Sequence, residues 1–321
     1  MKSWCCSVDR EGAPHKGALH EPAPPEAGFI WCHLDGRAEE ERRWLEEKSG
    51  LPHGVISALV AVETRPRSET FGAGALVNLR GLGTRHTDDP DPLVSIRLWA
   101  EKGRVISVSY RTLAATEEAS ERMAAGEIKD PGDLIAALAV MITEKLDPEI
   151  AMLGDMTDDC EAQLDADLAP DRSWAMRRRI ARARSEAISY RRFVVPQRQA
   201  LERLAALECS WLEEDDRMHL REAADRFARM GEELEAVRER SALLHEQLTD
   251  LRAELTETRT LVISVVALVF LPLTFITGLF GINYPFPFEQ AHWPFWAILG
   301  FCLVTAVAIT GYFMKARWFR R

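Results

Sequence analysis

The sequence predicts an α/β cytoplasmic domain followed by a long helical stalk and two C-terminal transmembrane helices. Short β-prone runs alternate with helical stretches in the first third, proline is absent from residues 216–271, and two uncharged stretches end the chain. The expected parts are a disordered tail at 1–28, an α/β domain at 29–130, a helical hairpin region at 131–215, a stalk helix continuous with the first span at 216–281 (the span itself at about 261–281), an outer loop at 282–293, a second span at 294–314 and a basic C-terminus at 315–321.

The α/β domain is predicted from four runs, FIWCHL, GALVNLRGL, LVSIRLWA and RVISVSY, which alternate with helical stretches near 39–48 and 53–62. Residues 1–28 are rich in Pro, Gly and charge. Because they contain no apolar core segment, we expect neither a secretory signal nor an ordered element there. From about Pro131 the pattern becomes almost wholly helical.

Charge and cysteine usage narrow the function classes. The formal charge is −10 and the pI is near 5.4, which argues against nucleic acid as a partner and favours cations. The six cysteines form no CxxC pair, so we expect reduced packing residues in a reducing compartment. They are Cys5, Cys6, Cys32, Cys160, Cys209 and Cys302.

The two apolar stretches each match the thickness of a bilayer. Between residues 261 and 314 the only charged side chain is Glu289, in the connecting loop. Arg252 and Arg259 precede the first span and four basic residues follow the second, whereas the loop has neither Lys nor Arg. Basic residues favour the cytoplasmic side, so both termini are expected there.

The stalk carries two different faces. Apolar or small residues recur at alternating steps of three and four from Phe227 to Val262, which is the pattern of a coiled-coil seam. The opposite face contains five acids and no base: Glu232, Glu239, Glu246, Asp250 and Glu257. The same face continues into the span as Thr260, Ser264, Ala267, Leu271, Thr274, Gly278 and Gly281.

This acidic face has two interpretations. It is either a solvated coiled-coil surface or, if several copies surround an axis, an electronegative vestibule that concentrates cations. One helix hairpin has no interior, so a water-filled path through lipid requires a ring of subunits.

Gly281, Ile282 and Asn283 stand where the first span leaves the membrane. In a ring, the Asn283 amides would present carbonyl oxygens to a hydrated divalent ion. The alternative interpretation is a helix C-cap, Gly followed by Asn.

Several segments together resemble the CorA family of divalent-cation transporters. The C-terminal hairpin with FLPLTFITGLFGIN at 270–283 carries the resemblance, and ETRPR at 63–67, LVSIRL at 93–98 and RRFVVPQRQ at 191–199 make the chain most similar to the ZntB-like, zinc-associated branch. The resemblance implies a funnel-shaped homopentamer in the bacterial inner membrane and zinc uptake coupled to the proton gradient. It also implies an outer filter at Gly281, Ile282 and Asn283, a polar ring at Thr274, and constrictions at Leu271, Ile263 and Thr260.

Two departures from the family pattern concern ion preference. Ile282 stands where magnesium-selective members have Met, and Tyr284-Pro285-Phe286-Pro287 replaces the glycine-rich loop of the zinc branch. The first span contains no Cys, His, Asp or Glu, so zinc is expected to pass largely hydrated with modest selectivity among divalent ions. Glu289 and His292, in the outer loop, either gather cations and sense pH or are ordinary interfacial residues.

The function predicted is transport of divalent cations, Zn²⁺ first, with Co²⁺, Ni²⁺ and Cd²⁺ as further substrates. The alternatives are a CorA-type Mg²⁺/Co²⁺ channel and, in a different class, a membrane-anchored coiled-coil scaffold or sensor. We find no nucleotide-binding, nucleophile or metalloprotease motif in a credible context, so no enzyme activity and no cofactor are expected. No tight metal site is assigned, although His219 and His245 on the stalk are conceivable ligands of a zinc sensor.

Overall fold

The computed structural model describes residues 3–9, 13–19, 27–62, 65–84, 91–165, 173–281 and 293–315. The chain divides into two compact units, Met1–Leu244 and His245–Arg321, which we describe separately. The division falls within one helix, α6 (Glu214–Phe280).

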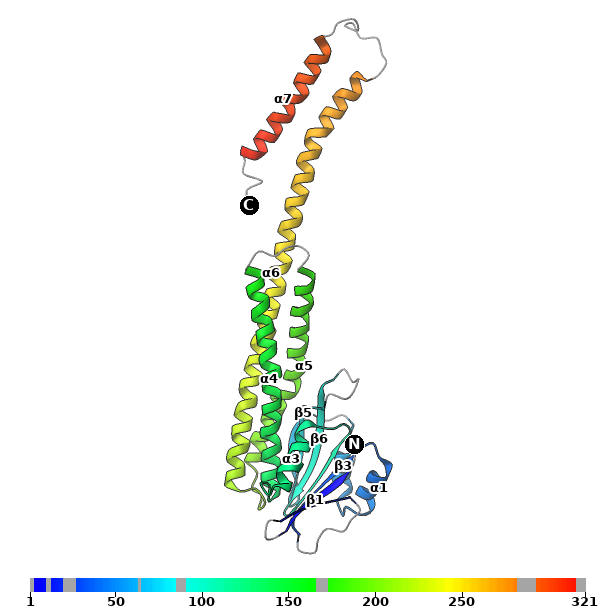
Figure 1. The fold of residues 1–321 in the computed structure, drawn as a ribbon, viewed down its shortest axis with the longest axis vertical. Helices are drawn as coiled ribbons and strands as arrows, with labels where there is room; N and C mark the ends of the chain where they lie inside the picture. The colour runs from blue at the N-terminus through cyan, green and yellow to red at the C-terminus, as the bar shows by residue number, and fades with distance from the viewer. Residues whose placement is uncertain are drawn as a thin grey trace. The chain divides into compact units, whose positions relative to one another are not determined.

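The first unit is built on a seven-stranded sheet in the order β2-β1-β3-β7-β6-β5-β4 (Figure 1). All neighbouring strands are antiparallel except the parallel pair β3 and β7. The strands are β1 (Trp4–Asp9), β2 (Pro14–Gly17), β3 (Ala27–Asp35), β4 (Arg67–Phe71), β5 (Gly74–Leu82), β6 (Leu93–Glu101) and β7 (Arg104–Ser109). The tight connection between β6 and β7 requires Gly103, whose φ of 76° is disfavoured for residues with a Cβ.

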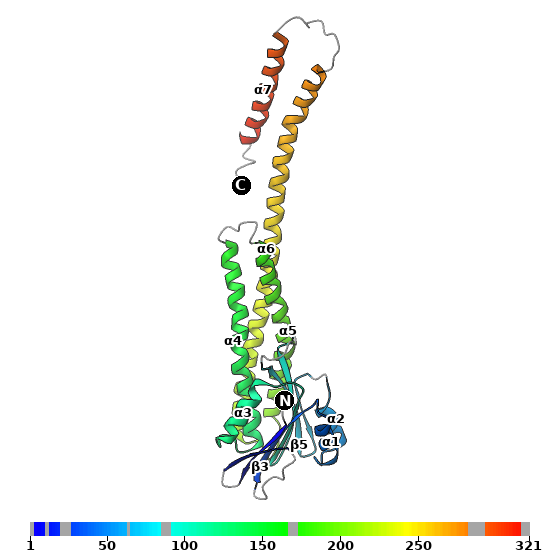
Figure 2. The same ribbon diagram turned by 45° about the vertical axis from the view of Figure 1, so that its right-hand side comes forward.

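Helices cover both faces of this sheet, and Figure 2 separates the two layers. One face packs against α1 (Glu39–Glu47) and α2 (His53–Leu59) around Leu34 and Ile106. The other packs against α3 (Ala114–Ala124), α4 (Pro131–Asp165) and α5 (Ser173–Ala205). Successive strand residues point to opposite faces, and because both faces are covered, the central strands are apolar almost throughout.

The four strands predicted from apolar runs are present as β3, β5, β6 and β7, and the two predicted short helices are present as α1 and α2. Strand β4 and helix α3 lie in the same domain but were not predicted, because neither RSETF nor AATEEASERMA has a continuous apolar run. The helices of the 131–215 region share one hydrophobic core with the sheet and with the first part of α6.

The prediction of a disordered tail over residues 1–28 is wrong where β1 and β2 form. β1 pairs antiparallel with β3 and buries Cys6 and Val8, so this segment completes the sheet. The prediction that all cysteines are reduced is also wrong, since Cys5 and Cys32 form a disulfide. They lie directly opposite each other in the β1–β3 register, a pairing that the sequence does not reveal because the two positions are 27 apart.

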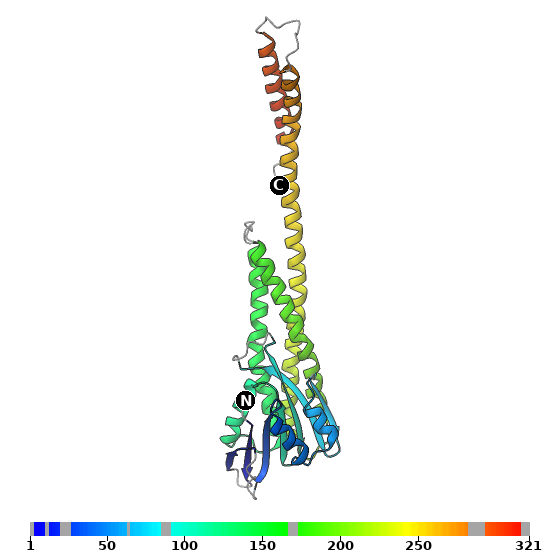
Figure 3. The same ribbon diagram turned by 90° about the vertical axis from the view of Figure 1, so that its right-hand side faces the viewer.

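The second unit consists of the C-terminal part of α6 and α7 (Trp293–Lys315), which runs antiparallel to it (Figure 3). Within the described residues, α6 contains the one segment long and apolar enough to cross a membrane, and a shorter apolar helix spans Trp296–Tyr312. The side chains of the α6 segment are largely exposed, with Leu271 70% and Phe275 71% accessible. Such an apolar surface is stable only against lipid or other protein.

Candidate ion pathway along α6

The first part of α6 is oriented by its buried face. Within the first unit, the seam residues predicted from the sequence are buried from Phe227 to Leu244, and those from Phe227 to Val237 share one core with α4 and α5. Polar contacts fix the same rotation: Arg240 pairs with Asp158 of α4, and Arg191 of α5 lies 2.9 Å from Glu235. The seam is therefore used within the chain, which turns the opposite face of α6 outward.

The acidic row, defined as Glu232, Glu239, Glu246, Asp250 and Glu257, lies on that outward face. All five side chains are exposed. Within the described residues none of the five forms a salt bridge, although acids elsewhere on α6 do, such as Glu222 with Arg226 and Glu235 with Arg238. The row therefore keeps uncompensated negative charge, which attracts cations over about one Debye length, roughly 8 Å in physiological salt.

The continuation of the row into the apolar segment is also exposed, except for half-buried Ala267. Thr260 and Ser264 each donate their hydroxyl to a backbone carbonyl four residues earlier, at 2.9 Å. These bonds use the hydroxyl protons, so the oxygen lone pairs remain available to a hydrated cation. Leu271 and Ile263, the predicted constrictions, are 70% and 69% exposed and flank the hydroxyl positions.

At the C-terminal end of α6, Gly281 donates its N–H to the carbonyls of Thr277 and Gly278 at 2.9 and 3.2 Å. This bonding closes the last turn of the helix, as expected for a glycine at that position. Gly278 and Thr274 lie about one and two turns earlier on the same exposed face. The other predicted outer-filter residues, Ile282 and Asn283, and the loop candidates Glu289 and His292 lie outside the described residues.

A separate cluster of carboxylates occurs at the helix starts of the first unit. Oxygens of Asp130, Asp133 and Asp216 lie within 4.8 Å of one another. Asp130 accepts a hydrogen bond from the Asp133 N–H at 2.9 Å, and Asp216 accepts one from the Glu213 N–H at 2.8 Å. Both bonds satisfy backbone donors at helix N-termini, so the cluster caps α4 and α6.

Burial first, and then the neighbouring charges of Asp130 and Asp133, raise the pKa of Asp216 to about 6 against the opposing hydrogen bond from the Glu213 N–H. Burial also raises the pKa of Asp130. Among the described residues this is the one group of three or more metal-ligand side chains, and it includes neither His219 nor His245. On α6, His245 is exposed and His219 is half-buried, with His219 Nδ1 3.7 Å from Asp215 Oδ2.

The last helix of the α/β unit, α6, continues into an exposed apolar segment, and one polar face follows the whole helix. This arrangement is typical of a membrane transport protein. Residues 26–317 match the sequence model of the family described as CorA-like Mg²⁺ transporter protein, and the chain belongs to this family. Its members are divalent-cation transporters and not enzymes, in agreement with the prediction from sequence.

Two curated relatives illustrate the range within the family. The zinc transport protein ZntB of Pectobacterium atrosepticum is 32% identical over 293 residues, covering 91% of this chain and 86% of the relative. The divalent cation transporter CmaX of Pseudomonas aeruginosa is also 32% identical, over 90% of this chain and 87% of its own.

Solved structures show the same fold. Full-length CmaX superposes with a TM-score of 0.76 at 28% identity and covers 97% of both chains. The CorA magnesium transporter of Methanocaldococcus jannaschii covers 99% of both chains with a TM-score of 0.80, and at 14% identity it supports the fold alone.

Proposed function

We propose that the chain forms a homopentamer in the bacterial inner membrane and conducts divalent cations, zinc first, through a pore surrounded by five copies of α6. Both termini lie in the cytoplasm. The observation that carries this proposal is the exposed acidic row, which forms no salt bridge within the described residues and continues on the same face of α6 into small and hydroxyl side chains. An exposed polar face on an otherwise apolar span is costly against lipid and favourable against water.

The ion is recognised through its hydration shell. The first span offers oxygen and backbone groups but no Cys, His or carboxylate, so no site there replaces all the water around Zn²⁺. Ions pass with part of their water, and Co²⁺, Ni²⁺ and Cd²⁺ compete with Zn²⁺ at similar concentrations. The names of the ZntB relatives support zinc as the leading substrate.

Proton coupling has to depend on residues outside the first span, because residues 261–281 contain no titratable acid or histidine. Glu289 and His292 are the acid and the histidine of the outer loop and are proposed to gather cations and sense pH at the outer entrance. The double substitution Glu289→Ala, His292→Ala should flatten the pH dependence of zinc uptake. Unchanged uptake and unchanged pH dependence would remove these residues from the account.

Two alternative functions are each supported by a specific observation. A Mg²⁺/Co²⁺ channel is supported by the description of the family, and it requires Mg²⁺ flux to exceed Zn²⁺ flux at equal concentrations. A coiled-coil scaffold or sensor is supported by the buried seam of α6, but that seam packs within the chain and leaves the acidic row unexplained.

The direct test is flux into liposomes that contain the purified protein and a dye sensitive to Zn²⁺ or Mg²⁺, with and without a proton gradient. Zinc should enter, faster when the outside is acidic. Asn283→Ala should reduce the rate at least tenfold, because it removes the amide oxygens of the proposed outer filter. Gln290→Ala, an amide substitution in the same loop outside the GIN motif, is the matched control and should leave the rate within about twofold of wild type.

A further inference from the structure

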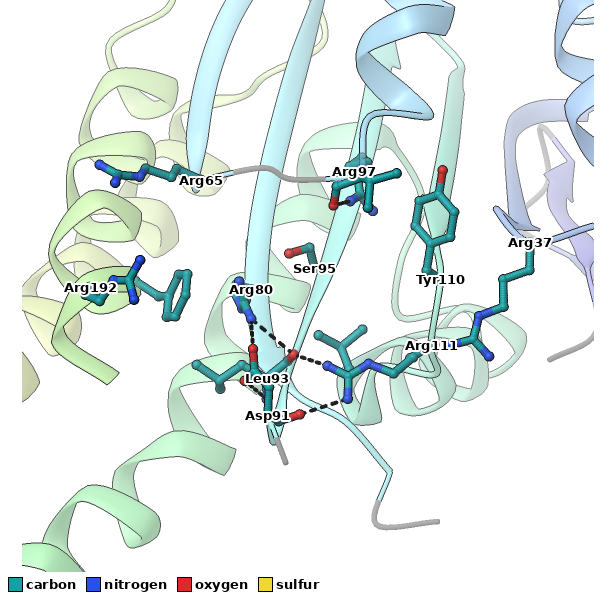
Figure 4. A pocket seen from close by; sticks show the side chains of 13 residues that line it. Arg37, Arg65, Arg80, Asp91, Leu93, Ser95, Arg97, Tyr110, Arg111 and Arg192 are labelled. Carbon is teal, nitrogen blue, oxygen red and sulfur yellow. Dashed lines mark hydrogen bonds and ion pairs between the residues drawn. The ribbon is translucent and has the colours of Figure 1, made fainter. Parts of the chain in front are cut away.

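A pocket of about 770 Å³ lies in the first unit between the sheet and α5, and none of its described lining residues comes from α6 (Figure 4). Its volume is in the range of sites for small molecules. Among the described residues, six arginines line it against a single carboxylate, Asp91, although the whole chain is acidic. The six are Arg37, Arg65, Arg80, Arg97, Arg111 and Arg192.

Three segments far apart in the sequence meet at this pocket. Arg65 comes from ETRPR, Arg97 from LVSIRL and Arg192 from RRFVVPQRQ, the segments that gave the sequence its resemblance to one branch of the family. Figure 4 shows Arg65 and Arg192 on one side of the pocket and Arg37 on the other. The transport proposal assigns none of these side chains a role.

The inner arginines are held in place by hydrogen bonds. Arg80 pairs with Asp91, and Arg111 donates to the Asp91 carbonyl at 2.8 Å. Gln197 of α5 accepts from the Arg80 N–H at 2.6 Å and donates to its carbonyl at 3.0 Å, which joins the sheet to α5 beside the pocket. The guanidinium groups are thus fixed in advance of any ligand, which lowers the entropy lost on binding.

The positive charge is incompletely compensated. The Nε–H groups of Arg80 and Arg97 are buried and have no hydrogen-bond partner among the described residues, and Arg97 is only 2% exposed. On the exposed rim, Arg37, Arg65 and Arg192 have no carboxylate partner within the described residues. Burial lowers the pKa of Arg80, and the charges of Arg111 and Arg192 lower it further, against the opposing effect of Asp91.

We propose that this arginine pocket binds a polyphosphate group, supplied by inorganic polyphosphate or by a nucleotide triphosphate. Guanidinium groups bind phosphate oxygens through paired N–H donors, and a chain of phosphates offers several negative charges to the excess of five positive ones among the described lining residues. A halide or one carboxylate would leave most of that excess unneutralised.

The aromatic side chains in the pocket indicate whether a nucleotide base would also contribute to binding. The Arg80 guanidinium lies 3.7 Å from the Phe193 ring centroid, and the Arg97 guanidinium lies 5.0 Å from that of Tyr110. Each ring therefore already has a cation over one face, and a nucleotide base gains little by stacking there. The polyphosphate group, rather than the base, should set the affinity.

The test is equilibrium binding of inorganic tripolyphosphate and of ATP, without added divalent ions, to the full-length protein in detergent. We expect one site per chain, with dissociation constants for the two ligands within about threefold of each other and weaker binding at higher salt. Arg192→Gln and Arg65→Gln, both on the exposed rim, should each weaken binding about tenfold, since each removes a charge-assisted contact. Arg198→Gln, an exposed arginine on α5 that pairs with Glu202, is the matched control and should change nothing.

Three outcomes would overturn the proposal: no binding at millimolar tripolyphosphate, equal loss of binding in Arg198→Gln, or displacement by chloride as effective as by tripolyphosphate at matched ionic strength. ATP binding far tighter than tripolyphosphate would show that the base is recognised and would contradict the assignment to the polyphosphate group. Binding is measured without transport, so this result is independent of the proposed conduction.

Discussion

Asp216 is buried at the start of α6 beside Asp130 and Asp133, and its pKa of about 6 lies above the ordinary 3.8. Between these two values the folded chain binds more protons than the unfolded chain, so stability falls as pH rises from about 4 to about 6 and stays lower above that. The capping bond from the Glu213 N–H is retained by either an Asp or an Asn oxygen.

We therefore expect Asp216→Asn to raise the free energy of unfolding at pH 7.5, by an amount on the order of 1 to 3 kcal/mol, and to have little effect near pH 4. Thermal unfolding of the detergent-solubilised protein at the two pH values measures this difference. Asp215→Asn, at the exposed position that precedes Asp216, should not raise the free energy of unfolding in this pH-dependent way. A stabilisation of equal size at both pH values would contradict the assignment.

Glu257 and Glu254 are both exposed acids on α6, three positions apart, but only Glu257 lies on the acidic row. Removing a charge that borders the pathway lowers the local concentration of cations, and this effect is screened by salt. Glu257→Gln should reduce zinc flux two- to fivefold at low ionic strength and less at high ionic strength, whereas Glu254→Gln should not. Equal effects of the two substitutions would show that only overall charge matters.

At the scale of the element, α6 has two faces that differ in what they contribute. Leu234 is fully buried beside α4 and α5, whereas Leu243 on the opposite face is 59% exposed. Leu234→Ala should lower the free energy of unfolding by about 2 to 5 kcal/mol, and Leu243→Ala by less than about 0.5 kcal/mol. Denaturant unfolding of the two variants measures this contrast, and similar losses would mean that the seam is not the packing face.

The sequence was most informative where one period extends over many residues. The seam and the acidic row of α6 follow from a repeat of three and four, and the apolar strands from continuous hydrophobic runs. Contacts between residues on different strands could not be predicted from such a repeat. The Cys5–Cys32 disulfide depends on the register between β1 and β3, and β1 itself has only three buried positions.

The arginine pocket was missed for a related reason. Its arginines come from strands β5 and β6, from α5 and from three connecting segments, and each segment contributes only one arginine. A cluster of that kind has no spacing in the sequence and becomes visible only when the fold brings the segments together. The acidic row, by contrast, lies on a single helix and could be predicted residue by residue.

At the scale of the whole molecule, conduction requires several chains, because one helix hairpin encloses no aqueous path. The purified protein in detergent should have a protein mass five times that of the 36.2 kDa chain, as measured by light scattering with the detergent contribution subtracted. A monomer or dimer that retains zinc flux in liposomes would contradict the ring.

The central claim is that the polar face of α6 surrounds a shared aqueous axis. Cysteine substitution tests it most directly: Thr274→Cys lies on the row and Ile276→Cys on the opposite face of the same helix turn, each in a background in which Cys302 is replaced by Ala. The account predicts that a hydrophilic thiol reagent blocks zinc flux through the Thr274→Cys protein and leaves the Ile276→Cys protein conducting. Block of the Ile276→Cys protein alone, or of neither protein despite active flux, would contradict it.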